Sequence, residues 1–368
     1  MVDRRALANL DWTLVVTTLA LTGAGILSIY SASRGVSGSL DTPFFVKQLW
    51  WLLCGAIAAI VVILFDYRTL LRLAYPCYFL SLCGLIYVLL FGRVISGAQR
   101  WIIIGPLTLQ PSEFMKISLI LTLANYFDRH EKPRPWNLRD LFIPAVITLF
   151  PALLIAKEPD LGTALVILVI FASMSFIVGM NLKSILVLTV LGLGSLPLGW
   201  SLLKDYQKGR IFTLFNPELD PLGSGYHLLQ SKIAVGSGGI WGKGLWGGTQ
   251  SRLNFLPEKH TDFIFSVFSE DLGFVGASLL LILYFIFLMR SIDVAYRAKD
   301  SLGALLAGGI ACMFTFSAAV NVAMTVGLAP VVGIPFPLIS YGGSALLASL
   351  MAIGLLLNVH LRRFKFSG

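Results

Sequence analysis

Residues 254–273 read NFLPEKHTDFIFSVFSEDLG and lead from a polar segment into a long apolar run. That run, 263–289, is long enough to cross a bilayer as a helix. Ionisable residues crowd around its start: Glu258, Lys259, His260, Asp262, Glu270 and Asp271. Because a carboxylate at the edge of hydrocarbon is costly, such a residue either has a partner or serves chemistry. Asp262 is therefore the first candidate functional residue.

The whole chain has the composition of a membrane protein. Of its 368 residues, 57% are hydrophobic and only 13% are charged. Apolar runs alternate with short charged or Gly/Pro-rich breaks, and the sequence predicts an all-α, polytopic integral membrane protein with about ten transmembrane helices. We expect one membrane domain covering 1–368. The predicted spans lie near 12–30, 49–65, 74–91, 112–127, 141–156, 161–180, 184–203, 263–289, 304–328 and 342–360.

Basic residues indicate the orientation of the chain. If Arg4 and Arg5 lie inside, the inner loops hold most of the Lys and Arg residues, and the short outer loops hold only Arg34, Lys47, Arg93, Arg100 and Lys157. Cytoplasmic loops carry an excess of basic residues, so both termini are predicted to be cytoplasmic. Segments 92–111 and 204–262 are then outer loops. The net charge of +9 is explained by anchoring to an anionic inner leaflet, and no nucleic-acid partner is expected.

Asp262 has two interpretations from its position. At helical spacing it shares a face with Ser266, Ser269 and Gly273. If Thr261 caps the helix, Asp262 lies in the first turn, where the positive helix end favours the ionised carboxylate while burial raises its pKa. Such a group suits a general base, but it also suits a residue that only caps the helix. The roles of orienting the base and capping the helix stay open for its neighbours Glu258, His260 and Glu270.

Further charged residues gather near the outer ends of other spans. Glu113 and Lys116 are three apart in the fourth span, so they share a helical face and either form a structural pair or belong to a polar cavity. Arg100 and Trp101 suit a phosphate or sugar ligand and equally suit an interfacial anchor. Asp160 lies in a charged turn between the fifth and sixth spans, where helix capping is the simpler explanation.

A glycine-rich stretch lies in the long outer loop. Residues 236–248 read GSGGIWGKGLWGG, and their backbone amides could hold a phosphate. Lys243 within the stretch could meet a lipid pyrophosphate, although a flexible loop explains the glycines as well. The stretch lacks the P-loop pattern, and the four histidines lack the spacing of a zinc centre. No metal ligands are therefore expected.

Taken together, the motifs resemble the SEDS family, the shape, elongation, division and sporulation proteins. Beside the 254–273 stretch, the resemblance rests on GAQRW at 97–101, QPSEFMK at 110–116, KEPDLG at 157–162 and PFPLISYGGS at 335–344. It covers essentially the whole chain, in register with the ten predicted spans. The short N-terminal tail and the GAQRW motif favour the elongation branch of the family, which serves rod shape, over the division branch.

The resemblance implies a peptidoglycan glycosyltransferase that polymerises lipid II on the outer face of the cytoplasmic (inner) membrane. Asp262 falls on the family's essential aspartate, which implies a general base on the 4-hydroxyl of the acceptor sugar while undecaprenyl pyrophosphate leaves. A class B penicillin-binding protein is the implied crosslinking partner. The residues implied to line the substrate cavity are Arg100, Trp101, Glu113, Lys116 and Asp160, to which the glycine-rich stretch adds Lys243.

The sequence leaves alternatives for both the cofactor and the function of the protein. Leaving-group charge could be stabilised by fixed cations or by a divalent cation such as Mg or Mn, and the sequence does not decide between them. A lipid II flippase would share the substrate but needs a polar path to the inner face, where the spans show little beyond anchors. A non-catalytic scaffold for cell-wall enzymes would tolerate replacement of Asp262. The polymerase is the favoured interpretation.

Overall fold

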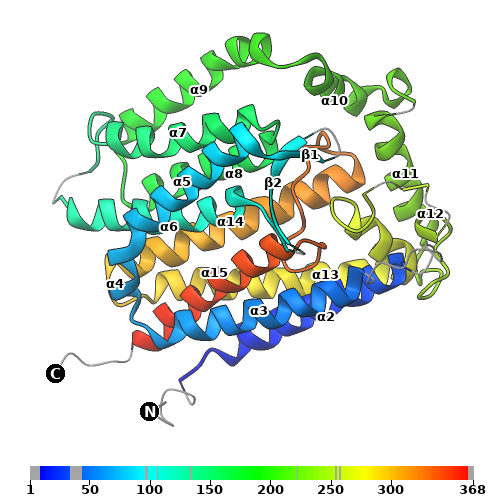
Figure 1. Cartoon of the computed structure of the whole chain (residues 1–368), viewed down its shortest axis with the longest axis horizontal. Coiled ribbons are helices and arrows are strands. Elements are labelled where there is room, and N and C mark those ends of the chain that lie inside the picture. Colours follow the sequence, from blue (N-terminus) through cyan, green and yellow to red (C-terminus); the bar gives the residue numbers. More distant parts are fainter. Residues whose placement is uncertain are drawn as a thin grey trace.

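A computed structural model of the chain describes residues 9–33, 44–95, 98–105, 107–132, 135–221, 223–252, 255–256 and 258–363. Within them the chain forms a helical bundle (Figure 1). Every predicted span corresponds to a helix, which confirms the helical membrane fold. These helices are α2 (Trp12–Ser33), α3 (Phe44–Leu64), α5 (Ala74–Phe91), α6 (Pro111–Arg129), α7 (Phe142–Lys157), α8 (Leu161–Ile177), α9 (Leu182–Leu202), α13 (Ile264–Tyr296), α14 (Ser301–Val326) and α15 (Gly343–Arg362).

Length and composition allow many of these helices to cross a membrane. Among the described residues, seven segments qualify, and α7 and α8 are shorter apolar helices. The seven are α2, α3, Tyr67–Phe91, Leu182–Ser201, α13, α14 and α15. Segment Tyr67–Phe91 joins α5 to the short helices α4 (Tyr67–Leu70) and η1 (Leu71–Leu73). Large apolar side chains such as Leu80, Phe142 and Leu279 are exposed on the outside, as lipid contact requires.

The core of the bundle is formed by α6, α14 and α15. In α6 nearly every residue is buried, although the helix contains charged and hydroxyl side chains. It packs against α5, α14, α8 and α15. Of the spanning segments, α14 and α15 are 67% and 78% buried. Polar residues of α6 therefore lie inside the protein and not on a lipid-facing surface.

A small antiparallel sheet forms where the sequence predicts only an outer loop. Its strands are β1 (Arg93–Ile95), β2 (Ala98–Ile104) and β3 (Leu107–Leu109), in the order β1-β2-β3. Ile102 pairs with Leu109 and Ile104 with Leu107 across a tight turn at Gly105, whose φ of 60° suits glycine. Consecutive isoleucines favour strands. The sequence predicts a loop for 92–111 and no sheet, because strands as short as β1 and β3 give little periodic signal.

The two ends of the bundle differ in character. The end that holds the start of α2 and the end of α15 carries the ion pairs Arg290–Asp11 at 3.0 Å, Arg362–Asp66 at 3.1 Å and Arg68–Asp300 at 2.6 Å. The sheet lies at the opposite end, with the outer-loop helices α10 (Asp205–Phe215), η2 (Pro217–Leu219), α11 (Ser224–Ser237) and α12 (Thr249–Arg252) (Figure 1). Some residues of the predicted loops and motifs lie outside the described residues: Arg4, Arg5, Arg34, Gly97, Asn254 and Pro257.

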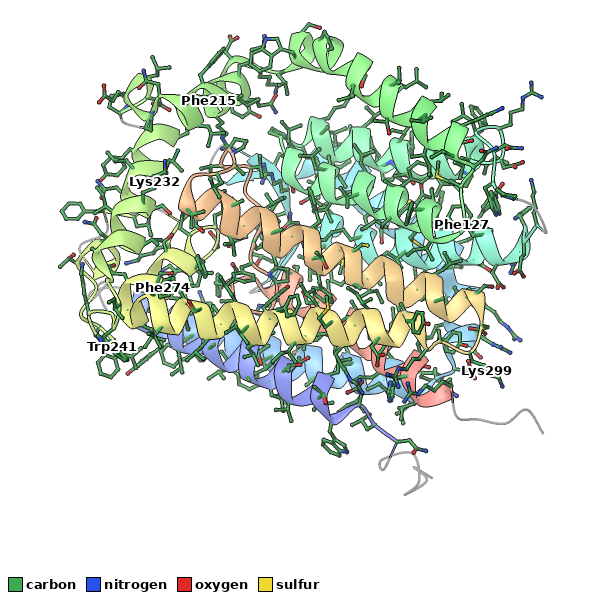
Figure 2. The ribbon with its side chains drawn as sticks, turned by 180° about the vertical axis from the view of Figure 1, so that it is seen from behind. Phe127, Phe215, Lys232, Trp241, Phe274 and Lys299 are labelled. Atoms are coloured by element: carbon green, nitrogen blue, oxygen red, sulfur yellow. The ribbon has the colours of Figure 1, made fainter. Side chains whose placement is uncertain are left out.

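Helix α13 is broken near its start, and the glycine-rich stretch closes the break. Gly273 has non-helical backbone angles, φ 66° and ψ −166°. The backbone groups freed there pair with the glycine-rich stretch: Lys243 N to Glu270 O at 3.1 Å, Gly244 N to Asp271 O at 2.9 Å, Phe274 N to Gly239 O at 2.9 Å and Val275 N to Ile240 O at 3.1 Å. Figure 2 shows Trp241 and Phe274 together at this end, far from Lys299. The glycine-rich stretch therefore provides hydrogen-bond partners for the backbone groups of α13 at its break.

Candidate functional site

Asp262 lies in a turn immediately before α13. The helix begins at Ile264 with Phe263 as its N-cap residue and no side-chain cap. Thr261, the predicted cap, donates instead from Oγ1 to the carbonyl of Glu258 at 3.3 Å. Glu258 has a left-handed φ of 49°, and its carbonyl also accepts from the N–H of Thr261 and Phe263. Because this turn closes before the helix starts, Asp262 is not in the first helical turn and does not cap it.

Two polar side chains hold the turn from the core. Asn321 of α14 donates from Nδ2 to the carbonyl of Asp262 at 3.0 Å and to that of Ile334 at 2.8 Å. Ser340 donates to the carbonyl of Thr261 at 2.6 Å. Asn321 is fully buried. The backbone at Asp262 is thus tied to a central helix and to the loop between α14 and α15.

The carboxylate of Asp262 is half-buried and has a raised pKa. Burial raises this pKa to about 6, and the negative charge of Glu258 adds to the rise. The positive charges of Arg100 and Arg210 oppose it. A carboxylate with this pKa is largely ionised at neutral pH and is more basic than an exposed aspartate, which suits a general base.

Arg100 of β2 is fastened to the turn between α7 and α8. Its Nε donates to the carbonyl of Glu158 at 3.2 Å and its Nη2 donates to the carbonyl of Pro159. Its Nη1 lies 3.8 Å from Oδ1 of Asp160. Asp160 in turn caps α8 by accepting from the N–H of Thr163 at 3.2 Å. The capping role predicted for Asp160 is observed, and the same residue pairs with Arg100.

Glu158 is the least expected member of this turn. Its side chain is 1% exposed, and Oε1 has no hydrogen-bond partner among the described residues. Burial raises the pKa of Glu158 to about 8, Asp160 adds to the rise and Arg100 opposes it. The group is therefore mostly protonated at pH 7, so the net charge around Arg100 is less negative than the sequence suggests.

Glu113 and Lys116 form the ion pair that their spacing predicts. Lys116 Nζ lies 2.8 Å from Oε1 of Glu113, and both side chains are buried. They line two adjoining hollows of about 20 Å³ each, together with Ser317 and Ser349, which is room for a water molecule. Ser340, which holds the Asp262 turn, lines one of them. Contact of the pair with substrate stays a prediction.

Lys243 binds a carboxylate other than Asp262. Lys243 Nζ lies 2.8 Å from Oε1 of the fully buried Glu270, at the break in α13. Glu270 lies about 9 Å along α13 from its first residue, Ile264, and Asp262 lies two residues before that start. Trp101 is adjacent to Arg100 in β2, at a register shift where Trp101 pairs with Arg93. Lys243 therefore has a structural partner, and contact of Trp101 with substrate stays a prediction.

The neighbours of Asp262 divide into different roles. Glu258 raises the pKa of Asp262, whereas Glu270 binds Lys243. His260 packs its ring against Phe44 with centroids 4.7 Å apart. Burial lowers the pKa of His260 to about 4, and Lys259 adds to the effect. His260 is therefore neutral at pH 7.

Segment 331–334 is the element on which the site converges. Arg210 of α10 donates from Nη1 to the carbonyl of Val331 at 3.0 Å. A Cβ at Gly333 would lie 3.5 Å from Oδ2 of Asp262, so the backbone passes beside the carboxylate. A Cβ at Gly162, next to the Asp160 turn, would lie 2.7 Å from the carbonyl of Val332. Sequence reasoning missed Arg210 because its only signal is one basic residue in a long loop.

Among the described residues, no group of three or more His, Cys, Asp or Glu side chains could hold a metal ion. Magnesium bound through substrate phosphates needs only one or two carboxylates. The partly exposed Asp262 and Glu258 could supply them. A divalent cation would therefore have to arrive with a phosphate-bearing ligand.

The bundle, its exposed apolar surface and the polar site at one end define a polytopic membrane protein. The chain belongs to the cell cycle protein family of FtsW, RodA and SpoVE, whose sequence profile matches residues 12–365. This confirms the membership that the motifs predict.

Individual relatives match over nearly their full length. The peptidoglycan glycosyltransferase MrdB of Escherichia coli (strain K12) is 39% identical over 360 residues, 98% of this chain and 95% of the relative. A probable peptidoglycan glycosyltransferase FtsW of Trichlorobacter lovleyi is 40% identical over 363 residues, 96% of this chain and 93% of the relative. A solved structure on the coordination of polymerization and crosslinking by a peptidoglycan synthase complex matches with a TM-score of 0.81 and 34% identity, covering 97% of this chain and 99% of that chain.

Proposed function

We propose that this protein is a peptidoglycan glycosyltransferase that joins the disaccharide-pentapeptide units of lipid II into glycan strands. Relatives named as peptidoglycan glycosyltransferases match almost the whole chain. The observation that carries the chemistry is the half-buried Asp262 carboxylate, whose pKa is raised to about 6 beside Arg100 and Arg210. A base and cations in one place meet the two needs of glycosyl transfer from a lipid diphosphate.

Asp262 acts as the general base in this proposal. It accepts the proton of the acceptor sugar's 4-hydroxyl as that oxygen forms a bond to the anomeric carbon of the growing chain. The anomeric carbon–oxygen bond breaks, and its electron pair leaves on undecaprenyl diphosphate. Asn321 fixes the backbone from which the carboxylate projects. Proton transfer of this kind contributes about 10²–10⁴-fold to a rate.

The remaining predicted residues have supporting positions in this scheme. Arg100 and Asp160 form an ion pair near segment 331–334. The positive charge of Arg100 lowers the pKa of Asp262, and the negative charge of Asp160 raises it. The buried Glu113–Lys116 pair lies behind the loop that holds the Asp262 turn. A bound divalent cation, if present, would neutralise diphosphate charge, with Asp262 and Glu258 as the nearest candidate ligands.

The proposed setting is the cytoplasmic (inner) membrane, with both termini in the cytoplasm and the Asp262 site facing outward. Support comes from the basic inner loops and from the common end occupied by the start of α2 and the end of α15. A class B penicillin-binding protein is the proposed partner. This is in line with the solved structure of a peptidoglycan synthase complex, one chain of which this chain resembles. The elongation role rests on the GAQRW motif, since MrdB and FtsW relatives match about equally.

The flippase and scaffold alternatives are less well supported. The polar groups at the other end of the bundle form ion pairs such as Arg290–Asp11 and Arg68–Asp300, which suit anchoring more than a transport path. A scaffold would give no reason for a desolvated aspartate held by a buried asparagine.

The test is polymerisation of purified lipid II by the purified full-length protein, with and without a class B penicillin-binding protein and with Mg, Mn or a chelator. Glycan strands separated by gel electrophoresis are the expected product. In parallel, labelled lipid II in liposomes measures transbilayer movement. Movement without any polymer under every condition would replace the polymerase by the flippase.

A further inference from the structure

Each cation that the sequence selects for the site is paired with a carboxylate. Arg100 lies 3.8 Å from Asp160, and Lys116 lies 2.8 Å from Glu113. Lys243 lies 2.8 Å from Glu270. A cation whose charge is compensated in this way has to give up a partner, often a buried one, before it binds another anion at full strength. The diphosphate of the proposed donor therefore needs a cation that is not already committed.

Arg210 meets this requirement. It is half-buried on α10 and makes one hydrogen bond, to the carbonyl of Val331 at 3.0 Å, while its guanidinium lies 5.9 Å from the ring centre of Tyr206. Within the part of the chain that the structure describes, no carboxylate forms an ion pair with it. A guanidinium has five N–H donors, so most of those of Arg210 are available to a ligand.

The position of Arg210 relative to the base also fits. Val331, which accepts its hydrogen bond, is two residues from Gly333, and the backbone at Gly333 borders Oδ2 of Asp262. Two residues span at most about 7 Å. The positive charge of Arg210 reaches Asp262, because it counteracts the burial that raises the pKa of that carboxyl.

Neither nearby histidine can replace Arg210 as the cation. Burial lowers the pKa of His227, which stacks on Phe263, and burial also lowers the pKa of His260. Both rings are therefore neutral at pH 7. Arg210 is therefore a cation next to segment 331–334 that forms no ion pair with a carboxylate among the described residues.

We infer that Arg210 binds the diphosphate group of the lipid-linked donor and stabilises the charge that develops on it as the anomeric bond breaks. The inference rests on the proposed function. The planar guanidinium matches phosphate oxygens with paired N–H donors, and a lysine at this position would act only as a point charge. Arg210 brings its charge from the outer loop, whereas Asp262 is held by the core.

The test is equilibrium binding of undecaprenyl diphosphate and of undecaprenol to the purified full-length protein. Arg210→Gln should weaken binding of the diphosphate lipid about tenfold or more and leave undecaprenol binding unchanged. Arg210→Lys should recover part of the loss. Lys208→Gln is the matched control, since it removes one positive charge from the same helix and should change neither affinity. Thermal melting identifies a variant that fails to fold.

Two results would overturn the inference: equal diphosphate affinity in wild type and Arg210→Gln, or the same loss for both lipids. Binding is measured without turnover, so these outcomes are distinct from failure of the proposed function, which is the absence of polymer from wild type.

Discussion

Nδ2 of Asn321 lies 3.0 Å from the carbonyl oxygen of Asp262, so a fully buried amide on a core helix fixes the backbone of the proposed base. The same amide donates to the carbonyl of Ile334, within segment 331–334, whose Gly333 borders the Asp262 carboxylate. Position and reactivity of the base therefore depend on a residue that does not touch substrate in our scheme.

Asn321→Ala should lower both stability and polymerisation. Each buried carbonyl left without a donor costs about 1–3 kcal/mol. The matched control is Asn358→Ala, because Asn358 is also buried and donates to the carbonyls of Val62 and Phe65 at 2.5 Å, at the other end of the bundle. Melting temperature and rate per folded molecule are the measurements. Equal rates per folded molecule for the two variants would contradict a positioning role for Asn321.

The pH dependence of polymerisation should report Asp262. The ionised base is lost below a pKa of about 6, so the rate should fall about tenfold per pH unit well below 6 and level off above it. Glu258→Gln removes the carboxylate that raises this pKa, so the acid limb should move to lower pH. Glu218→Gln, at an exposed position of the same outer loop, is the control. An unmoved limb in Glu258→Gln would count against Asp262 as the titrating group.

Lys243→Met should destabilise the protein by about 3–5 kcal/mol, because it leaves Glu270 buried without its cation. Adding Glu270→Gln should recover most of the stability, since the N–H of Gln250 and the hydroxyl of Thr249 still have an acceptor. Melting and polymerisation are measured on both variants. A double variant that is stable but inactive would return Lys243 to the list of substrate-binding residues.

Gly242→Ala should loosen the glycine-rich stretch from α13. Gly242 has φ 79°, and a Cβ there would collide with the carbonyl of Asp271. The cost should be about 2 kcal/mol or more. Gly236→Ala is the control, because no atom lies within 4 Å of its Cβ position and alanine favours the helix. A similar melting temperature for the two variants would show that the stretch is not packed on the break.

The sequence predicts most of the fold but only part of the site, for physical reasons. Apolar runs of membrane length are a strong local signal, so each predicted span corresponds to a described helix. The Glu113–Lys116 pair follows from helical spacing, whereas the partner of Lys243 depends on how a loop packs against a distant helix. Arg210 contacts Val331 across 121 residues, which no local pattern reveals.

The sheet and the start of α13 illustrate the same limit at element boundaries. Strands of three residues such as β1 and β3 are too short for a visible alternation, and Gly105 marks the turn between β2 and β3 only once the pairing is known. Thr261 is a good capping residue by type, but the left-handed conformation of Glu258 redirects its hydroxyl. Asp262 is visible as a candidate in the sequence because it is a charge beside an apolar run, and its role stays a prediction.

The central claim is that Asp262 removes the acceptor proton, and the rate of lipid II polymerisation by Asp262→Ala tests it most directly. The variant should melt close to wild type, because the groups that hold this turn are backbone carbonyls that alanine keeps. Its polymerisation rate should fall by at least about 100-fold at pH 7. A folded Asp262→Ala protein that makes glycan strands at the wild-type rate would contradict the account.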